Sequence, residues 1–282
     1  MIQKIEKNLI SEALKSEKGQ EKLIEEIRNQ MKISLINKGV GKKLLYAEKE
    51  LIYSAPMYDL DTDSLFYEKN KKNNFFEKLF NNKIKEDWNR WEKNHPYCVL
   101  QGNDRAIAKP FEKEFNLHIC FSKTNMVETF NTEIQKIESK IISVEDKFIF
   151  SIIDIASTDE KNPVIFYDLI TIDIIKLAIN KIREHGLNVT KIVVNSEMYS
   201  CINDLIKNNF RSIIIIVSEY VPINTFYVMA DSEFVGVIPM YVDDILIYNP
   251  NSILDSCINY NIVKKIGGII LNSKSIVKIE HY

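Results

Sequence analysis

The chain has 282 residues, of which 45% are hydrophobic and 27% are charged, as in folded proteins rather than disordered ones. Its apolar runs fall well short of the ~20 residues that a membrane span needs, so we expect no membrane partner. The first residues mix charged and apolar side chains and lack the apolar core of a signal peptide, which predicts synthesis in the cytoplasm. Only 8 residues are glycine, and no GxxxxGK[ST] or GxGxxG motif occurs, which argues against a glycine-rich phosphate loop.

The net charge of −2 is unevenly distributed along the chain. Residues 1–123 contain 23 Lys and Arg against 19 Asp and Glu, whereas residues 124–282 contain 14 against 20. Two interpretations are open: charges scattered over solvated faces, or a basic half that faces a polyanion. The basic excess is too small to predict sequence-specific nucleic-acid binding.

The first forty residues predict a helical segment. Apolar residues recur among Glu and Lys over residues 2–37, with an interruption expected at Gly19 and a break at Gly39 and Gly41. We interpret this segment as an appendage outside the core. Strand-like sequence follows over residues 44–66.

Residues 67–95 combine Lys, Asn and aromatic side chains at near-helical spacing. This pattern fits a short amphipathic helix that buries its aromatics, or a basic-aromatic surface for nucleic acid. Residues 97–121 then predict a hairpin, in which YCVLQ and FEKEFNLHICF flank the turn-prone Gly102.

The strongest periodicity lies at residues 124–157. An apolar side chain recurs at alternating spacings of three and four residues, first as Val127, Phe130, Ile134, Ile137, Ile141, Val144 and Phe148. The stripe predicts one long helix, with Asn125 and Glu128 resembling a capping box at its start. A coiled coil is an alternative, but the flanking strand-like segments favour a helix that lies across a sheet.

After residue 163 the pattern alternates between helix and strand. Helices are predicted at 169–184 and 197–207, the second capped by Asn195 or Ser196. Strands are predicted at 191–194, 212–217, 225–230, 234–238 and 244–248, and two more lie in the C-terminal IVKKIGGIILNSKSIVKIE.

We find no residue set that predicts catalysis, cofactor binding or a metal site. His95, Cys98, His118 and Cys120 are zinc ligands by type, and His118 and Cys120 would share a strand face, but their spacing matches no compact zinc motif. None of the four cysteines forms a CxxC pair, so we expect reduced thiols. The adjacent Glu145 and Asp146 point about 100° apart on a helix and are interpreted as a solvated or interface-facing edge, not an acid/base pair.

The order of the elements resembles the major capsid proteins of tailed bacteriophages, of the Hong Kong 97 type. PFEKEFNLHICF and the long helix after it resemble the strand and spine helix of that family. VSEYVPINTFYVMADSEFVGVI is similar to a family run, here formed by Val221, Pro222, Tyr227, Ala230, Asp231, Val235 and Gly236. IGGIILNSKSIVKIE resembles the returning C-terminal strands. The resemblance covers residues 110–282 by pattern and residues 40–110 by position.

The resemblance implies an α+β fold with an N-terminal arm, an extended loop, a peripheral domain with a spine helix, and an axial α/β domain. The corresponding intervals are 1–43 for the arm, 44–110 for the loop region, 111–163 for the peripheral strand and spine helix, 164–257 for the axial domain and 258–282 for the return to the peripheral domain.

The function implied is that of a major capsid protein, not an enzyme, which self-assembles into an icosahedral shell around double-stranded DNA. Its partners would be further copies of itself, portal and scaffolding or decoration proteins, and DNA held by non-specific contact. It would be located in the virion after assembly in the bacterial host cytoplasm. An encapsulin-type shell around a protein cargo is the alternative with the same fold, and an α/β enzyme with an unrecognised site is an alternative of another class.

Overall fold

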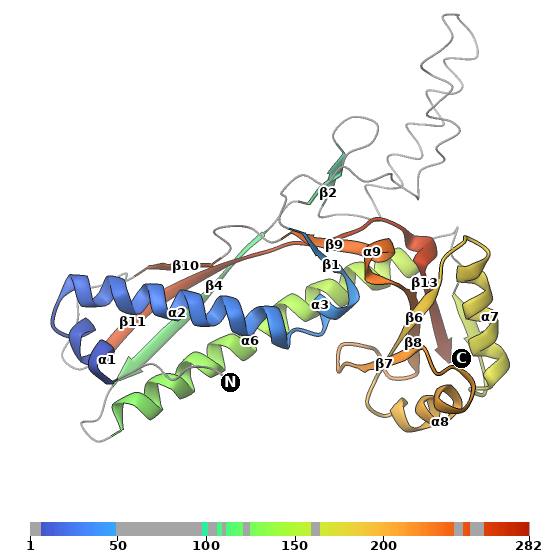
Figure 1. The fold of residues 1–282 in the computed structure, drawn as a ribbon, viewed down its shortest axis with the longest axis horizontal. Helices are drawn as coiled ribbons and strands as arrows, with labels where there is room; N and C mark the ends of the chain where they lie inside the picture. The colour runs from blue at the N-terminus through green and yellow to red at the C-terminus, as the bar shows by residue number, and fades with distance from the viewer. Residues whose placement is uncertain are drawn as a thin grey trace, which may run out of the picture. The chain divides into compact units, whose positions relative to one another are not determined.

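The computed structural model describes residues 7–48, 98–100, 106–108, 111–120, 125–158, 164–239, 245–248 and 257–281 (Figure 1). The chain divides into two units, each assembled from separate segments. Unit 1 comprises residues 1–39, 110–146 and 241–266, and unit 2 comprises residues 40–109, 147–240 and 267–282. The five intervals expected from the sequence remain a prediction. In the described part of the chain, no helix combines the length and apolar character required to span a membrane.

The N-terminal helices of unit 1 are α1 (Lys7–Ala13) and α2 (Glu17–Lys38). The break between them is set by Ser16, whose Oγ accepts a hydrogen bond of 3.1 Å from the backbone N–H of Gly19 and so caps α2. The predicted interruption at Gly19 is therefore wrong, because Gly19 lies inside the first turn of α2. Its missing side chain lets the helices approach closely, since a Cβ there would lie 2.3 Å from the carbonyl oxygen of Glu12.

The sheet of unit 1 is antiparallel, in the order β10 (Ile245–Tyr248), β11 (Cys257–Ile266) and β4 (Phe111–Cys120). All ten residues of β4 pair with all ten of β11, from Cys120 opposite Cys257 to Phe111 opposite Ile266. The predicted hairpin is wrong in its partner: β2 (Cys98–Leu100) pairs with β3 (Ala106–Ala108). Gly102 lies outside the described residues. Strand β4 instead pairs with β11, which has the same number of residues.

The long helix α6 (Met126–Ser157) packs on this sheet, as the apolar stripe predicts, and a coiled coil is not needed to bury it. Alternate residues of β4 are buried, and Figure 1 shows α2 and α6 running along the strands. One core joins the two helices to the sheet; it includes Leu23, Ile27, Met31, Leu35, Leu117, Ile119, Phe130, Ile134, Ile137, Ile141, Tyr260 and Ile262. The interpretation of the N-terminal segment as an appendage is therefore wrong. Its apolar residues recur every four positions, which places them on one buried helix face.

Unit 2 contains a five-stranded mixed sheet. The strand order is β5 (Ile165–Tyr167), β13 (Ile276–His281), β8 (Thr225–Ala230), β6 (Val189–Val194) and β7 (Ile214–Val217). Helix α7 (Ile172–Arg183) contacts four of the strands, and α8 (Tyr199–Asn209) connects β6 to the parallel β7. Every residue of the middle strand β8 is buried. The two helices and most of the strands predicted after residue 163 are confirmed, but β5 was not predicted. The C-terminal segment contains parts of three strands, β11 (Cys257–Ile266), β12 (Ile269–Ile270) and β13, where two were predicted.

A smaller sheet of unit 2 joins distant segments. Its order is β1 (Tyr46–Glu48), β9 (Gly236–Pro239) and β12 (Ile269–Ile270), beside the short helices α3 (Gly41–Leu44) and α9 (Ser232–Val235). A 3-10 turn, η2 (Ser273–Ser275), leads into β13. Gly236 must be glycine because a Cβ would lie 2.2 Å from the carbonyl oxygen of Ile269. Strand β1 confirms part of the predicted 44–66 strand region; the rest of it and the 67–95 segment lie outside the described residues.

Candidate assembly surfaces and buried charges

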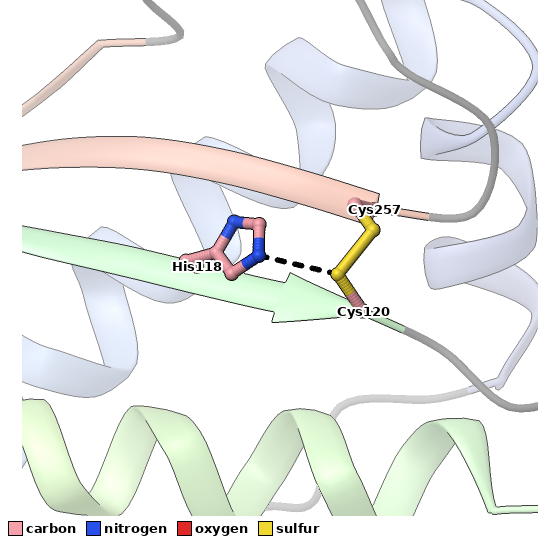
Figure 2. Close-up of side chains that lie close together, drawn as sticks. All are labelled: His118, Cys120 and Cys257. Carbon is pink, nitrogen blue, oxygen red and sulfur yellow. Dashed lines mark hydrogen bonds between the residues drawn. A yellow bond between two sulfur atoms is a disulfide. The ribbon is translucent and has the colours of Figure 1, made fainter.

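Three of the residues considered as metal ligands or thiols come together in unit 1. His118 and Cys120 share the exposed face of β4, as expected, and Cys257 of β11 lies opposite Cys120 (Figure 2). Cys120 and Cys257 form a disulfide, so the expectation of reduced thiols is wrong for this pair. Cys201 is an exposed free thiol. His95 lies outside the described residues, and only the backbone of Cys98 is described.

Glu145 and Asp146 of α6 are buried, which corrects their interpretation as a solvated or interface-facing edge. Their exposed fractions are 6% and 3%. Glu145 Oε1 lies 3.2 Å from the ammonium of the equally buried Lys264 in β11. The partner is 119 residues away in the sequence, so its presence could not be inferred from the helix alone. The removal of either partner of such a buried pair leaves the other charge uncompensated in an apolar site, which is costly.

A second buried carboxylate of α6 contacts α2. Glu138 is 1% exposed, and its Oε2 accepts a hydrogen bond of 2.9 Å from Ser34 Oγ. The same oxygen lies 3.2 Å from the ammonium of Lys38. These contacts orient the N-terminal helix on the long helix within unit 1, in addition to the apolar core. Their role is structural, because both polar partners of the carboxylate come from the same helix and hold it in place.

In unit 2 the end of α6 supplies Asp154 to a polar cluster. The hydroxyl of the buried Tyr227 donates to Asp154 Oδ1 over 2.8 Å, and the ammonium of Lys278 lies 2.9 Å from the same oxygen. Burial, and then the nearby Asp154 carboxylate, raise the pKa of Tyr227 above its usual range. Burial alone would lower the pKa of Lys278, but hydrogen bonds and charges from Asp154 and Glu280 outweigh it and raise the pKa. Both groups therefore keep their protons at neutral pH.

The prediction that Asn195 or Ser196 caps the second helix is wrong, because α8 begins at Tyr199 and its N-cap is Met198. Asn195 instead supports the turn before α8. Its Oδ1 accepts a hydrogen bond of 3.0 Å from the backbone N–H of Glu197, and its Nδ2 donates over 2.9 Å to the carbonyl of Val221. The side chain thus ties the end of β6 to the segment that precedes β8. This role explains why an amide, which both donates and accepts, stands at this position.

The two outer strands of the five-stranded sheet expose large apolar side chains. Among the described strands, β5 pairs only with β13 and β7 only with β6, so the outer edge of each pairs with no other described strand. On the β7 side, Ile214 is 62% and Val217 is 40% exposed. On the β5 side, Phe166 is 50% and Leu169 is 76% exposed. Open edges with exposed apolar residues are typical of surfaces that another chain covers.

Charged side chains lie beside both edges, including the exposed Glu219 just after β7 and Lys176, which pairs with Asp173 over 3.4 Å. A cavity of about 350 Å³ lies beside β7, and its lining includes Tyr199, Lys207 and Arg211. Next to β5, the exposed residues include Asp168 and, in the first turn of α7, Asp173. We call the outer strand β7 with its exposed side chains Ile214 and Val217 the β7 edge, and β5 with Phe166 and Leu169 the β5 edge. The sequence predicts β7 but neither β5 nor the strand order, so neither edge could be recognised before the structure was known.

No family model matches the chain, and no curated protein matches it. A phage-related protein from Bordetella bronchiseptica RB50 is similar in structure, with a TM-score of 0.55 at 9% identity over 89% of this chain and 95% of that one. The virus-like particle protein of Pyrococcus furiosus matches with a TM-score of 0.48 at 14% identity, covering 65% and 83%. The capsid protein of cyanophage P-SCSP1u matches with a TM-score of 0.46 at 11% identity, covering 65% and 77%.

At such identities a likeness shows the fold and nothing of the activity. The chain has the α+β fold of the Hong Kong 97 type, with a long helix on an antiparallel sheet in unit 1 and an α/β sheet in unit 2. The fold class expected from the sequence is confirmed.

Proposed function

We propose that this chain is a major capsid protein of a tailed phage or prophage, which self-assembles into an icosahedral shell around double-stranded DNA. Its role is structural and not enzymatic. The observation that supports this most is the exposure of large apolar side chains at the two outer strands of the five-stranded sheet of unit 2. The Hong Kong 97 fold is compatible with this function, and the exposed apolar edges are surfaces through which copies could associate.

The two edges are different surfaces, so a contact between them joins the β7 edge of one copy to the β5 edge of the next. Such a heterologous contact repeats head to tail and closes into a ring when the rotation allows. Ile214 and Val217 would cover Phe166 and Leu169 of the neighbour. Lys207 and Arg211 would face acidic residues such as Asp168. Many such contacts of modest strength stabilise a shell through multivalency.

The remaining partners follow from charge and from the shell itself. The basic excess in residues 1–123 suits non-specific attraction to DNA phosphates, which needs no sequence readout. Portal, scaffolding or decoration proteins would join the shell during assembly in the host cytoplasm, and the finished subunit would reside in the virion.

The first test uses Ile214→Asp, with Ile33→Asp as the matched control. Both isoleucines are well exposed, at 62% and 65%, but Ile33 lies in α2, outside both edges. We expect Ile214→Asp to fold normally by circular dichroism but to fail to form rings or shells in electron microscopy and sedimentation. The control should assemble like the unmodified chain. Equal assembly of the two variants would refute the edge contact, and an unmodified chain that stays monomeric at every concentration and salt would refute the shell.

A charge-reversal pair makes the test specific to the two edges. Lys207→Glu with Arg211→Glu should reduce assembly, and adding Asp168→Lys with Asp173→Lys should restore it. Restoration requires that the two edges meet, because surface charges that act separately give no rescue. Particles from the native source should contain nuclease-protected DNA. Particles that hold one protein species and no nucleic acid would contradict the capsid proposal and support the encapsulin-type compartment.

A further inference from the structure

The ladder between β4 and β11 ends in a cluster of zinc-ligand side chains on the face opposite the core. His118, Cys120 and Cys257 offer one nitrogen and two sulfur atoms, which all lie within 4.8 Å of one another (Figure 2). His118 Nε2 lies 3.2 Å from Cys120 Sγ. His118 and Cys120 are exposed, and Cys257 is partly exposed, so an ion can reach them.

The register of the strands explains the convergence. Cys120 stands directly opposite Cys257, and His118 directly opposite Asn259, so the four side chains fall on one face in two adjacent cross-strand pairs. The Cα atoms of the two cysteines are only 4.1 Å apart. Side chains at such a closely spaced pair approach each other more than at the wider pairs of an antiparallel ladder.

Asn259 gives the histidine the orientation that a metal ligand needs. Its Oδ1 is hydrogen-bonded to His118 Nδ1. An amide oxygen only accepts, so this contact fits the tautomer in which Nδ1 carries the proton and Nε2 presents its lone pair toward Cys120. Histidines that bind metals are held in this way, with the second ring nitrogen donating to an oxygen acceptor.

We propose that His118, Cys120 and Cys257 bind one Zn²⁺ ion when the two cysteines are reduced. Around a tetrahedral zinc, ligand atoms lie about 3.5–3.8 Å apart for typical Zn–N and Zn–S lengths, close to the present spacing of Nε2 and Cys120 Sγ. The sulfur atoms must separate, which requires that the disulfide be opened. Water fills the fourth position. The sequence spacing predicted no metal site because the third ligand lies 137 residues from the second.

The disulfide and the zinc ion are thus alternative links across the same strand pair. Two molecules of a small thiol such as glutathione would open the disulfide by supplying two electrons and two protons, and would themselves be joined as one disulfide. Zn²⁺ then displaces the two thiol protons and is held by the two thiolates and the neutral imidazole. In a reducing compartment the thiol form predominates, which is the form that binds the ion.

The test titrates the full-length chain with Co²⁺, a spectroscopic stand-in for Zn²⁺, after reduction with a phosphine. We expect one Co²⁺ per chain with thiolate-to-cobalt charge-transfer absorption, which Zn²⁺ abolishes on addition. Cys120→Ser or Cys257→Ser should remove most of that absorption and weaken binding at least 100-fold. Asn259→Ala, which alters no ligand, should weaken binding about 10-fold. The control variant Cys98→Ser/Cys201→Ser should bind like the unmodified chain.

Oxidised glutathione provides a second readout. The oxidised chain should take up no Co²⁺, and Zn²⁺ should raise the melting temperature of the reduced chain only. The proposal is overturned if the reduced chain shows no charge-transfer absorption, if Cys120→Ser/Cys257→Ser binds as tightly as the unmodified chain, or if binding is lost in Cys98→Ser/Cys201→Ser. Circular dichroism of each variant separates loss of the site from loss of the fold.

Discussion

Unit 1 and unit 2 differ in how many of their large apolar side chains are exposed. Among the described residues, the large hydrophobic side chains that are exposed in unit 1 are Ile33 and Tyr248, whereas unit 2 exposes nine: Tyr46, Phe166, Leu169, Leu177, Tyr199, Ile214, Val217, Ile223 and Phe234. Unit 1 also buries charged groups, such as Glu138, Glu145 and Lys264. The long helix and its sheet therefore bury nearly all of their large apolar side chains, whereas the sheets of unit 2 leave several exposed.

The largest expected effect comes from deleting residues 1–38. The deletion removes five large apolar side chains of the unit 1 core, at a cost on the order of 10 kcal/mol, comparable to the stability of a whole domain. We expect hydrogen exchange to show lost protection in β4 and β11 and retained protection in β6 and β8. Retained protection in β4 and β11 would restore the interpretation of the segment as an appendage.

Ile141→Asp tests the same core with one side chain. Ile141 is fully buried in α6, so an aspartate there would be an unpaired charge in an apolar site. We expect the free energy of unfolding of unit 1 to fall by roughly 4 kcal/mol or more, and assembly to be lost with it. Lys140→Asp places the same carboxylate on the exposed side of the helix and should leave the melting temperature nearly unchanged. A stable Ile141→Asp chain that still assembles would show that this face is not core.

Glu145→Gln addresses the buried charges of unit 1. The substitution removes one charge of the pair with Lys264 and leaves that buried ammonium without its carboxylate at 3.2 Å. Breaking a buried pair on one side costs about 3 kcal/mol. Denaturant unfolding measures the loss, and Glu145→Leu/Lys264→Met should recover most of it. If the single variant is as stable as the unmodified chain, the pair does not hold helix and strand together.

Tyr227→Phe is expected to have the smallest effect, in unit 2. It removes the hydrogen bond to Asp154, worth about 1.5 kcal/mol because the acceptor is charged. The raised pKa of Tyr227 adds a pH dependence: an unfolded tyrosine ionises near pH 10, whereas the folded one keeps its proton. Stability should therefore be complete below pH 10 and fall above it, by up to ~1.4 kcal/mol per pH unit from this group.

The change in the free energy of unfolding with pH above pH 10 tests that prediction. Tyr260, whose pKa burial raises to about 12, and Lys278, whose pKa is also raised, act in the same direction and remain in the variant. Tyr227→Phe should therefore lose stability less steeply between pH 10 and 11 than the unmodified chain, in urea unfolding at fixed ionic strength. Identical slopes would mean that Tyr227 ionises equally in both states.

Local patterns in the sequence were enough to predict the long helix and most strands of unit 2. The stripe from Phe130 to Ile141 determines one face of α6 because helix periodicity is a local property. The four-residue repeat of Leu23, Ile27, Met31 and Leu35 was an equally local signal, and it was available in the sequence although its burial was not predicted.

Features that depend on strand pairing could not be predicted in the same way. The partner of β4 begins at Cys257, 137 residues after Cys120, and nothing in either segment specifies the other. The burial of Glu145, the disulfide and the two edges all follow from such distant pairings. Residue types near each position therefore gave no sign of these sites until the strand order was known.

The same pairings have a consequence during translation. Strand β11 lies between β10 and β4, and β13 lies between β5 and β8. In both of these sheets, the inner strand is synthesised after the two strands with which it pairs. A nascent chain that stops before residue 257 can complete neither sheet. Until those inner strands have been made, β10, β4, β5 and β8 lack an inner partner, and unpaired strand edges of this kind make incomplete chains prone to aggregation.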